Sequence, residues 1–159
     1  IDNNTHQTVN LSALCEQVAE AAQALSQDQH QFDLHIEDGI QLQGVMQDLY
    51  SALSNIAFNA VRYTPAGGTV QIILRRESHS EAYFAITDTG LGIAAEHIPH
   101  LTERFYRVDS ARSRHNGGTG LGLAITKHAL AEHDAILEID SVLGQGSTFS
   151  VRFTLSEQV

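Results

Sequence analysis

The stretch RHNGGTGLGLAITKHA, residues 114–129, places four glycines within six positions and then continues as a helical pattern. Glycine weakens helices and strands, so such a cluster indicates backbone that turns sharply or closely approaches a ligand, most often a phosphate. The cluster is not a P-loop, because Leu123 and Ala124 stand where that motif requires Lys and Ser/Thr. It is not a dinucleotide-binding fingerprint either, because from Gly118 the third glycine would fall on Leu123. Its role therefore has to be sought in the rest of the chain.

The composition is that of a soluble globular domain. The 159 residues are 42% hydrophobic and 18% charged, enough for one domain with a sizeable core, and we find neither a membrane-spanning run nor a signal peptide. The single cysteine excludes an internal disulfide framework, and we expect its thiol to be buried and inert. We interpret the nine histidines as scattered surface residues and not as a metal site. The expected buried stripe of the first helix is Leu11, Leu14, Cys15, Val18, Ala22 and Leu25.

The net charge of −10 argues against nucleic acid as a partner. Of nine basic residues, however, four arginines fall within eleven positions, just before the glycine cluster. This pattern fits a local anion site, and it fits a solvated basic loop equally well. The four residues are Arg104, Arg107, Arg112 and Arg114.

Hydrophobic periodicity predicts hairpins that alternate with helices, with the helices on one face of a sheet, which is an α/β two-layer sandwich. The first helix should be capped near Asn10 or Ser12. Helices are expected over 9–26, 45–63, 94–101 and 119–133, strands over 31–37, 40–44, 69–77, 81–88, 135–140 and 147–155, and a long loop over 102–118.

The expected helix over 45–63 has two different faces. Its polar face carries Asn55 and Asn59, four residues apart, with Arg62 beyond them and Asp48 and Ser51 before them. Asparagine is a poor residue for a helix interior, and amide oxygens beside a cation could hold Mg²⁺ and a phosphate. An ordinary solvated face is the alternative. The expected core face is Val45, Met46, Leu49, Leu53, Ile56, Ala57, Ala60 and Val61.

The segment ITDTGLGI, residues 86–93, places Asp88 at the end of an apolar strand and follows it with Gly90, Gly92 and Ile93. A carboxylate there can accept a hydrogen bond from the exocyclic amino group of adenine, whereas guanine would present an unpaired oxygen. The glycines would let a flat base lie against the backbone. A tight turn started by Asp88 is the alternative interpretation.

Together these segments resemble the catalytic and ATP-binding domain of sensor histidine kinases, within the wider gyrase, Hsp90 and MutL superfamily. The chain is similar to the family's N box at NIAFNAVRYT, its first glycine box at DTGLGI, its F box at ERFYR, and its second and third glycine boxes at GTGLGL and GQGSTF. Within that family it looks closest to the phosphate-regulon sensor kinases. The resemblance implies a Bergerat-type fold over 1–159, with a mixed, mostly antiparallel sheet, about three helices on one face and a mobile ATP lid at 102–118.

The resemblance also implies roles for individual residues. Asn59 and Asn55 would be Mg²⁺ ligands, Asp88 would bind the adenine amino group, and Arg107 would reach the γ-phosphate of ATP. Two departures from the family pattern are Arg62, where many relatives have Lys, and Thr102, which replaces an apolar residue. Asn55 and Arg107 are assigned to catalysis, and the expected nucleotide-binding residues are Asn55, Asn59, Arg62, Tyr63, Asp88, Gly90, Gly92, Ile93, Arg107, Gly118, Thr119, Gly120, Leu121, Gly122, Leu123 and Thr148.

The expected activity follows from one position. Relatives that hydrolyse ATP carry a Glu where this chain has Asn55, and Asn is a poor general base, so hydrolysis should be slow. The γ-phosphate would instead pass to a His on a dimerisation domain, and from there to an Asp of a response regulator. None of the nine histidines here has the setting of that acceptor, so we expect the chain to be a monomeric fragment that binds ATP without phosphorylating itself.

By the same resemblance, the parent protein would be a homodimeric sensor of the inner membrane. This domain would lie on the cytoplasmic side, without contact to the membrane. Two alternatives remain open: a nucleotide-sensing regulatory module without transfer, and a serine kinase of the anti-sigma-factor type.

Overall fold

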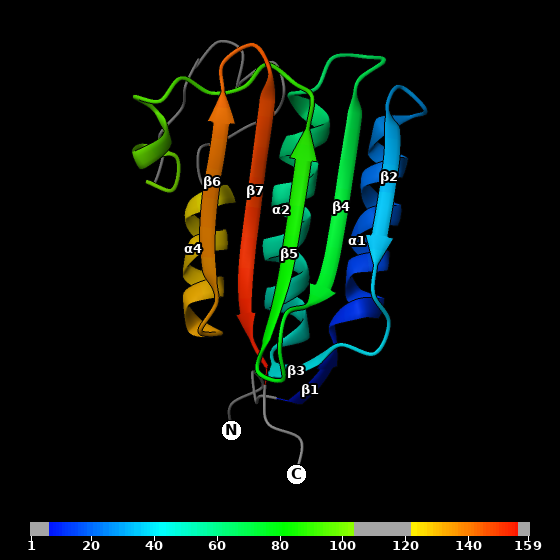
Figure 1. The fold of residues 1–159 in the computed structure, drawn as a ribbon, viewed down its shortest axis with the longest axis vertical. Helices are drawn as coiled ribbons and strands as arrows, with labels where there is room; N and C mark the ends of the chain where they lie inside the picture. Colours follow the sequence, from blue (N-terminus) through cyan, green and yellow to red (C-terminus); the bar gives the residue numbers. More distant parts are fainter. Residues whose placement is uncertain (1–6, 104–121, 156–159) are drawn as a thin grey trace.

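The computed structural model describes residues 7–103 and 122–155, which form a sheet covered on one face by helices (Figure 1). The sheet has the strand order β2-β4-β5-β7-β6, and only the β2–β4 pair is parallel. This confirms the expected two-layer sandwich with a mixed, mostly antiparallel sheet. The strands are β2 (Gln31–Ile36), β4 (Thr69–Arg76), β5 (Glu81–Asp88), β6 (Ile136–Val142) and β7 (Gly146–Thr154), and the described helices are α1 (Leu11–Ser26), α2 (Met46–Arg62), α4 (Gly122–Glu132) and the short 3₁₀ helix η1 (Ile98–His100).

Helix α1 forms as its sequence predicts. The side chain of Asn10 caps it by accepting a hydrogen bond from the backbone N–H of Ala13 at 3.0 Å. Cys15 is fully buried in the hydrophobic core, and burial raises the pKa of its thiol. The thiol therefore stays protonated, which fits the expectation of an inert core cysteine.

Two predicted core residues are wrong. Leu25 is 42% exposed because the buried stripe of α1 runs from Ala22 to Ser26 and leaves it out. Met46, the first residue of α2, is 46% exposed. Conversely, Ala52 and Ser54 are buried although they lie outside the predicted core face. Helix α2 packs against both α1 and α4, so its flanks are covered as well as its sheet-facing side.

The strands predicted over 31–37 and 40–44 do not pair with each other as a hairpin. Strand β3 (Gln41–Gly44) pairs with β1 (Gln7–Asn10), a strand that overlaps the start of the helix predicted over 9–26. Strand β2 instead pairs with β4 in parallel. The connection between β2 and β3 is anchored on α1, because Ser12 Oγ donates to Glu37 O at 2.6 Å and accepts from Ile40 N–H at 3.0 Å.

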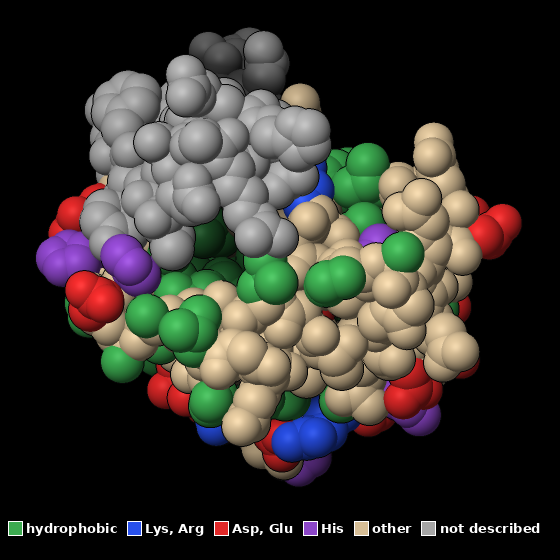
Figure 2. Space-filling model, turned by 90° about the horizontal axis from the view of Figure 1, so that it is seen from above, with side chains coloured by type: hydrophobic (Ala, Val, Ile, Leu, Met, Phe, Trp, Pro, Cys, Tyr) green, Lys and Arg blue, Asp and Glu red, His purple; other side chains and the backbone are tan. Residues whose placement is uncertain are grey.

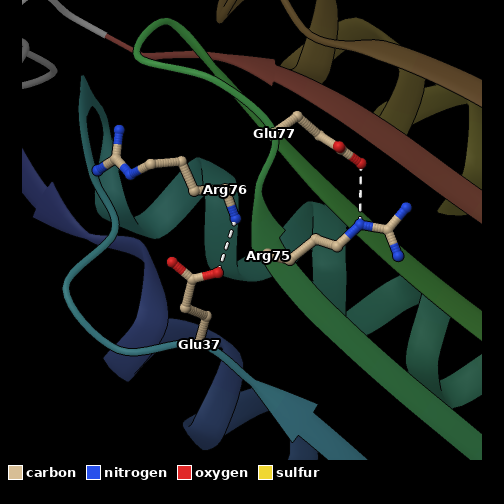
Figure 3. A network of polar contacts seen from close by, with 4 residues as sticks. All are labelled: Glu37, Arg75, Arg76 and Glu77. Atoms are coloured by element: carbon tan, nitrogen blue, oxygen red, sulfur yellow. Dashed lines mark hydrogen bonds and ion pairs between the residues drawn. The ribbon is translucent and has the colours of Figure 1, made fainter.

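The parallel β2–β4 pair continues into a polar contact at its end (Figure 3). The backbone N–H of Glu37 donates to Leu74 O at 2.9 Å, and the Glu37 carboxylate accepts from the backbone N–H of Arg76 at 3.1 Å. Next to it, Arg75 Nε donates to Glu77 Oε1 at 2.9 Å. The Glu37 side chain thus satisfies a β4 donor beyond the last backbone pair.

One histidine corrects the expectation that all histidines lie on the surface. His133 is 7% exposed, and its Nδ1 contacts Ala129 O at 2.7 Å while Val45 N–H donates to its Nε2 at 3.0 Å. A carbonyl only accepts, so Nδ1 carries the proton and Nε2 is the acceptor. The ring thereby joins the end of α4 to the start of α2, and it fills the space that a Cβ on Gly44 would need.

Candidate functional site

The site begins at Asp88, the last residue of β5, on the helix-facing side of the sheet. Asp88 is 7% exposed and lies directly opposite Ser147 of β7. Its carboxylate accepts hydrogen bonds from the backbone N–H groups of Gly90, at 2.9 Å, and of Ser147. Burial raises the pKa of Asp88 above its ordinary value of 3.8, and the two backbone hydrogen bonds oppose that shift. The result is a buried acceptor at the end of a strand.

The loop that follows Asp88 interlocks with two other segments. Leu91 N–H donates to Tyr63 O at the end of α2, at 3.3 Å, and Leu91 O accepts from Gly144 N–H of the β6–β7 turn at 2.7 Å. Both glycines of the loop are required by close approach: a Cβ on Gly90 would collide with the Tyr63 carbonyl, and one on Gly92 with the Val142 carbonyl. Their first role is therefore to let three backbone segments meet beside Asp88.

Helix α2 contributes the asparagines. Asn55 is half-buried, and its Nδ2 lies 3.4 Å from both Gly122 O and Thr126 Oγ1 of α4. Thr126 is fully buried and donates its own hydroxyl proton to Ala52 O at 3.3 Å, so it can only accept from Asn55. This arrangement uses the amide nitrogen of Asn55 for the contacts with α4, so these two contacts do not engage its oxygen.

The other expected site residues of this segment lie one and two turns further on, at the end of α2 and its C-cap. Asn59 and Tyr63 are half-buried and Arg62 is exposed, and the carbonyl of Tyr63 holds the Asp88 loop. The asparagine face therefore ends next to the buried carboxylate. Seen from this end of the molecule, backbone and uncharged polar side chains occupy much of the surface, and acidic side chains lie mainly toward the rim (Figure 2).

Several expected site residues lie outside the described residues, as does most of the predicted lid: Arg107, Gly118, Thr119, Gly120, Leu121 and positions 104–118. Gly122 begins α4 beside Asn55, and Leu123 packs against the core. Ile93 is half-buried in the Asp88 loop. Within the described parts of the chain, no group of three or more His, Cys, Asp or Glu could hold a metal.

The structure does not bring Thr148 to this site. Its hydroxyl lies 3.0 Å from that of Thr87, on the sheet face opposite to Asp88. Ser147 lies beside Asp88 instead, and the sequence carried the signal, since Phe149, Val151 and Phe153 alternate on the buried face and place Ser147 among them. Sequence reasoning also missed Thr126 and Ser141, whose roles depend on contacts between distant segments.

This geometry, a buried strand-end carboxylate beside an asparagine-bearing helix in a two-layer sandwich, coincides with a match to a known family. Residues 44–157 match the model of the histidine kinase-, DNA gyrase B- and HSP90-like ATPases. The chain belongs to this family.

Within that family the chain has the sequence and fold of the ATP-binding catalytic domain of sensor histidine kinases. It is 48% identical over 146 residues to the phosphate regulon sensor protein PhoR of Pseudomonas aeruginosa, covering 91% of this chain and 33% of that protein. It is 38% identical over 153 residues to the PhoR of Haemophilus influenzae, covering 93% of this chain and 36% of that protein. The chain thus spans about a third of the length of these relatives.

Solved structures agree with this classification. The mycobacterial sensor histidine kinase MprB superposes with a TM-score of 0.85 at 28% identity, covering 96% of this chain and all of that one. Full-length ShkA in complex with AMPPNP gives a TM-score of 0.80 at 25% identity, covering 99% of this chain and 33% of that one. Among the described helices of the present chain, none is long and apolar enough to cross a membrane.

Proposed function

We propose that this domain binds Mg-ATP and donates the γ-phosphate to a histidine on a dimerisation domain, from which it passes to an aspartate of a response regulator. One observation carries the proposal: the asparagine face of α2 and the buried carboxylate of Asp88 meet at one end of the fold, joined by the Leu91–Tyr63 hydrogen bond. A nucleotide that spans the two would place its base at Asp88 and its phosphates along α2.

Asp88 would recognise the base. Asp88 is buried, and the backbone donors of Gly90 and Ser147 already bind its carboxylate. A further donor to this carboxylate would therefore come from a ligand. The exocyclic amino group of adenine is a donor of the right kind, and a base with an oxygen at that position would leave two acceptors facing each other. The domain should therefore prefer ATP to GTP.

The asparagines fit a magnesium ion. Mg²⁺ takes a few protein oxygens and completes its shell with phosphate oxygens and water, and the contacts of Asn55 with α4 use its amide nitrogen and not its oxygen. Asn59, one turn further on, would be the second ligand, with Arg62 and Tyr63 beside the phosphates. When bound, the ion neutralises phosphate charge. Asn55 cannot act as a general base that activates water, so hydrolysis of ATP should be slow.

The resemblance supports the roles proposed for residues beyond the described part of the chain. Arg107 would stabilise charge on the γ-phosphate, and the backbone amides of Gly118, Gly120 and Gly122 would cradle the phosphates. The whole protein would be a homodimeric, membrane-bound sensor with this domain on the cytoplasmic side.

The decisive experiment mixes this domain with γ-labelled Mg-ATP and a separately expressed dimerisation domain of the same parent protein. Acid-labile, base-stable label on that partner is the expected result, because phosphohistidine has this stability. ATP binding without transfer would favour a nucleotide-sensing module, and acid-stable label on serine would favour a serine kinase. Absence of nucleotide binding would contradict the whole proposal.

The Asn59→Ala variant tests the metal-binding role. We expect it to abolish the Mg²⁺-dependent part of nucleotide affinity, because the variant removes an oxygen ligand and adds none. The measurement is ATP titration with and without Mg²⁺. Ser51→Ala, on the same face of α2 and exposed, is the matched control and should change nothing. Unchanged affinity in Asn59→Ala would exclude this residue from the site.

A further inference from the structure

Ser141, near the end of β6, is a polar residue to which the proposed mechanism gives no role. Its hydroxyl makes three short contacts: Ile93 N–H donates to it at 2.7 Å, it donates to Gly146 O at 2.9 Å, and it lies 2.8 Å from the hydroxyl of Ser147. It therefore joins the loop after Asp88 to the start of β7.

The direction of these hydrogen bonds follows from valence. A serine hydroxyl has one proton and two lone pairs, and a backbone carbonyl can only accept. The single proton of Ser141 therefore goes to Gly146 O, and its lone pairs accept from Ile93 N–H and from the Ser147 hydroxyl. All three contacts are satisfied together only if Ser147 is the donor to Ser141.

This direction matters because Ser147 lies opposite Asp88. Directly opposed residues on antiparallel strands have Cβ atoms about 4.5–5.5 Å apart, so a free Ser147 hydroxyl could turn and donate to the carboxylate. In the structure its proton is held by Ser141, and only lone pairs remain to face the site. The carboxylate keeps its acceptor capacity for a ligand.

We propose that Ser141 is a specificity-determining positioning residue: by holding the proton of Ser147, it keeps the Asp88 pocket composed of acceptors and so selective for a purine with an exocyclic amino group. This inference rests on the proposed function, in that Asp88 is taken to read the base. Ser141 itself does not touch the nucleotide and acts through Ser147.

Without Ser141, the Ser147 hydroxyl would be free to donate to Asp88 and to compete with the amino group of the base. The competition affects only ligands that carry this amino group. A general loosening of the loop would weaken every nucleotide to the same degree. The ratio of two affinities therefore separates a role in specificity from a merely structural one.

The experiment measures the affinity of this domain for Mg-ATP and for the triphosphate of purine riboside, which has a hydrogen in place of the amino group. In Ser141→Ala we expect the preference for ATP to fall about tenfold, the effect of weakening one hydrogen bond to a charged group. Ser141→Thr keeps the hydroxyl and should restore the preference. An undiminished preference in Ser141→Ala would overturn the proposal.

A double-mutant cycle with Ser147→Ala tests the route of the effect. When the Ser147 hydroxyl is absent, adding Ser141→Ala should change the preference less than about twofold, because no proton is left to misdirect. A full additional loss would show that Ser141 does not act through Ser147. Should Ser141→Ala fail to fold, Ser141→Cys, a poor acceptor, should reduce the preference, and an unchanged preference would overturn the proposal.

The nucleotide preference of the wild-type protein separates failure of the role proposed for Asp88 from failure of the role proposed for Ser141. If it binds ATP no better than the purine riboside triphosphate, Asp88 does not read the amino group and the base-recognition part of the proposed function fails. If the wild type prefers ATP and Ser141→Ala keeps that preference, only the role of Ser141 fails.

Discussion

The two halves of the candidate site are built in different ways. Around Asp88 three contacts are short, at 2.7–2.9 Å from Ile93 to Ser141, from Gly144 to Leu91 and from Gly90 to Asp88, and the contact from Leu91 to Tyr63 is longer, at 3.3 Å. On α2, the contacts of Asn55 with described residues of α4 are 3.4 Å long. Asn59 is half-buried and Arg62 is exposed. Hydrogen bonds beyond about 3.2 Å are weak. The proposed base-binding end is therefore held mainly by short contacts of the fold, whereas the proposed metal and phosphate end would be organised by its ligands.

The largest expected effect is a loss of stability in the region around Asp88. Gly92→Ala should destabilise the domain by about 3 kcal/mol, because the new Cβ meets the Val142 carbonyl at a residue with φ +71°. Gly144→Ala is the matched control: its φ is +84°, but nothing lies within 4 Å of the new Cβ, so about 1 kcal/mol is expected. Urea unfolding of both variants measures the difference. Equal losses would mean that backbone conformation, and not the interlock, is what Gly92 provides.

Asp88→Asn should have the next largest effect, this time on binding. Replacing the carboxylate by an amide weakens the hydrogen bond to the amino group of adenine, and we expect ATP affinity to fall about thirtyfold. Arg107→Ala, assigned to the transfer step, should reduce binding far less. Titration of ATP into both variants compares them, and the reverse ranking would exchange the two roles.

A smaller effect on ATP affinity is expected at the contact between Asn55 and α4. Thr126→Val removes the hydroxyl that orients Asn55 while keeping the buried volume, so Mg²⁺-dependent ATP affinity should fall about threefold with little change in stability. Thr126→Ser, which keeps the hydroxyl, should bind like the wild type. Equal affinity in Thr126→Val and Thr126→Ser would mean that the orientation of Asn55 does not depend on α4.

The smallest effect is a pH dependence. Because burial raises the pKa of Asp88, its carboxylate takes up a proton at a higher pH than an ordinary Asp with a pKa of 3.8. As the pH falls through this raised pKa, ATP affinity should decrease, while that for purine riboside triphosphate, whose phosphates titrate alike, should not. For folding the sign is opposite: the folded state binds this proton more tightly, so the contribution of Asp88 to stability decreases as the pH rises through that pKa. Parallel loss of both nucleotides would exclude Asp88 as the titrating group.

Local patterns predicted the elements and several site residues. Periodicities of 3.6 and 2 residues gave the main helices and strands, and Asp88 with Gly90 and Gly92 followed from a strand that ends in a glycine-rich loop. Thr148 was listed among the expected nucleotide-binding residues, although the alternation around Phe149 placed Ser147, and not Thr148, on the buried face with Asp88. This error came from an unused pattern and not from missing information.

Pairing between distant segments could not be read in the same way. Asp38-Gly39, a dipeptide typical of turns, separates β2 from β3 and favours a hairpin, yet β2 pairs with β4, and β3 pairs with β1. His133 lies just beyond α4, and its position does not reveal that it bonds Val45 N–H, 88 residues away. Such choices depend on which segments meet in space.

The sequence by itself determined the kinds of element, their order and the chemistry of the candidate residues, because periodicity, capping and glycine placement act over a few neighbouring positions. Only the tertiary structure decided that the Asp88 loop, the end of α2 and the β6–β7 turn interlock, and that the proton of Ser147 is drawn to Ser141. The physical reason is that a hydrogen bond depends on the position and remaining valence of both partners, and here these partners come from separate strands and loops.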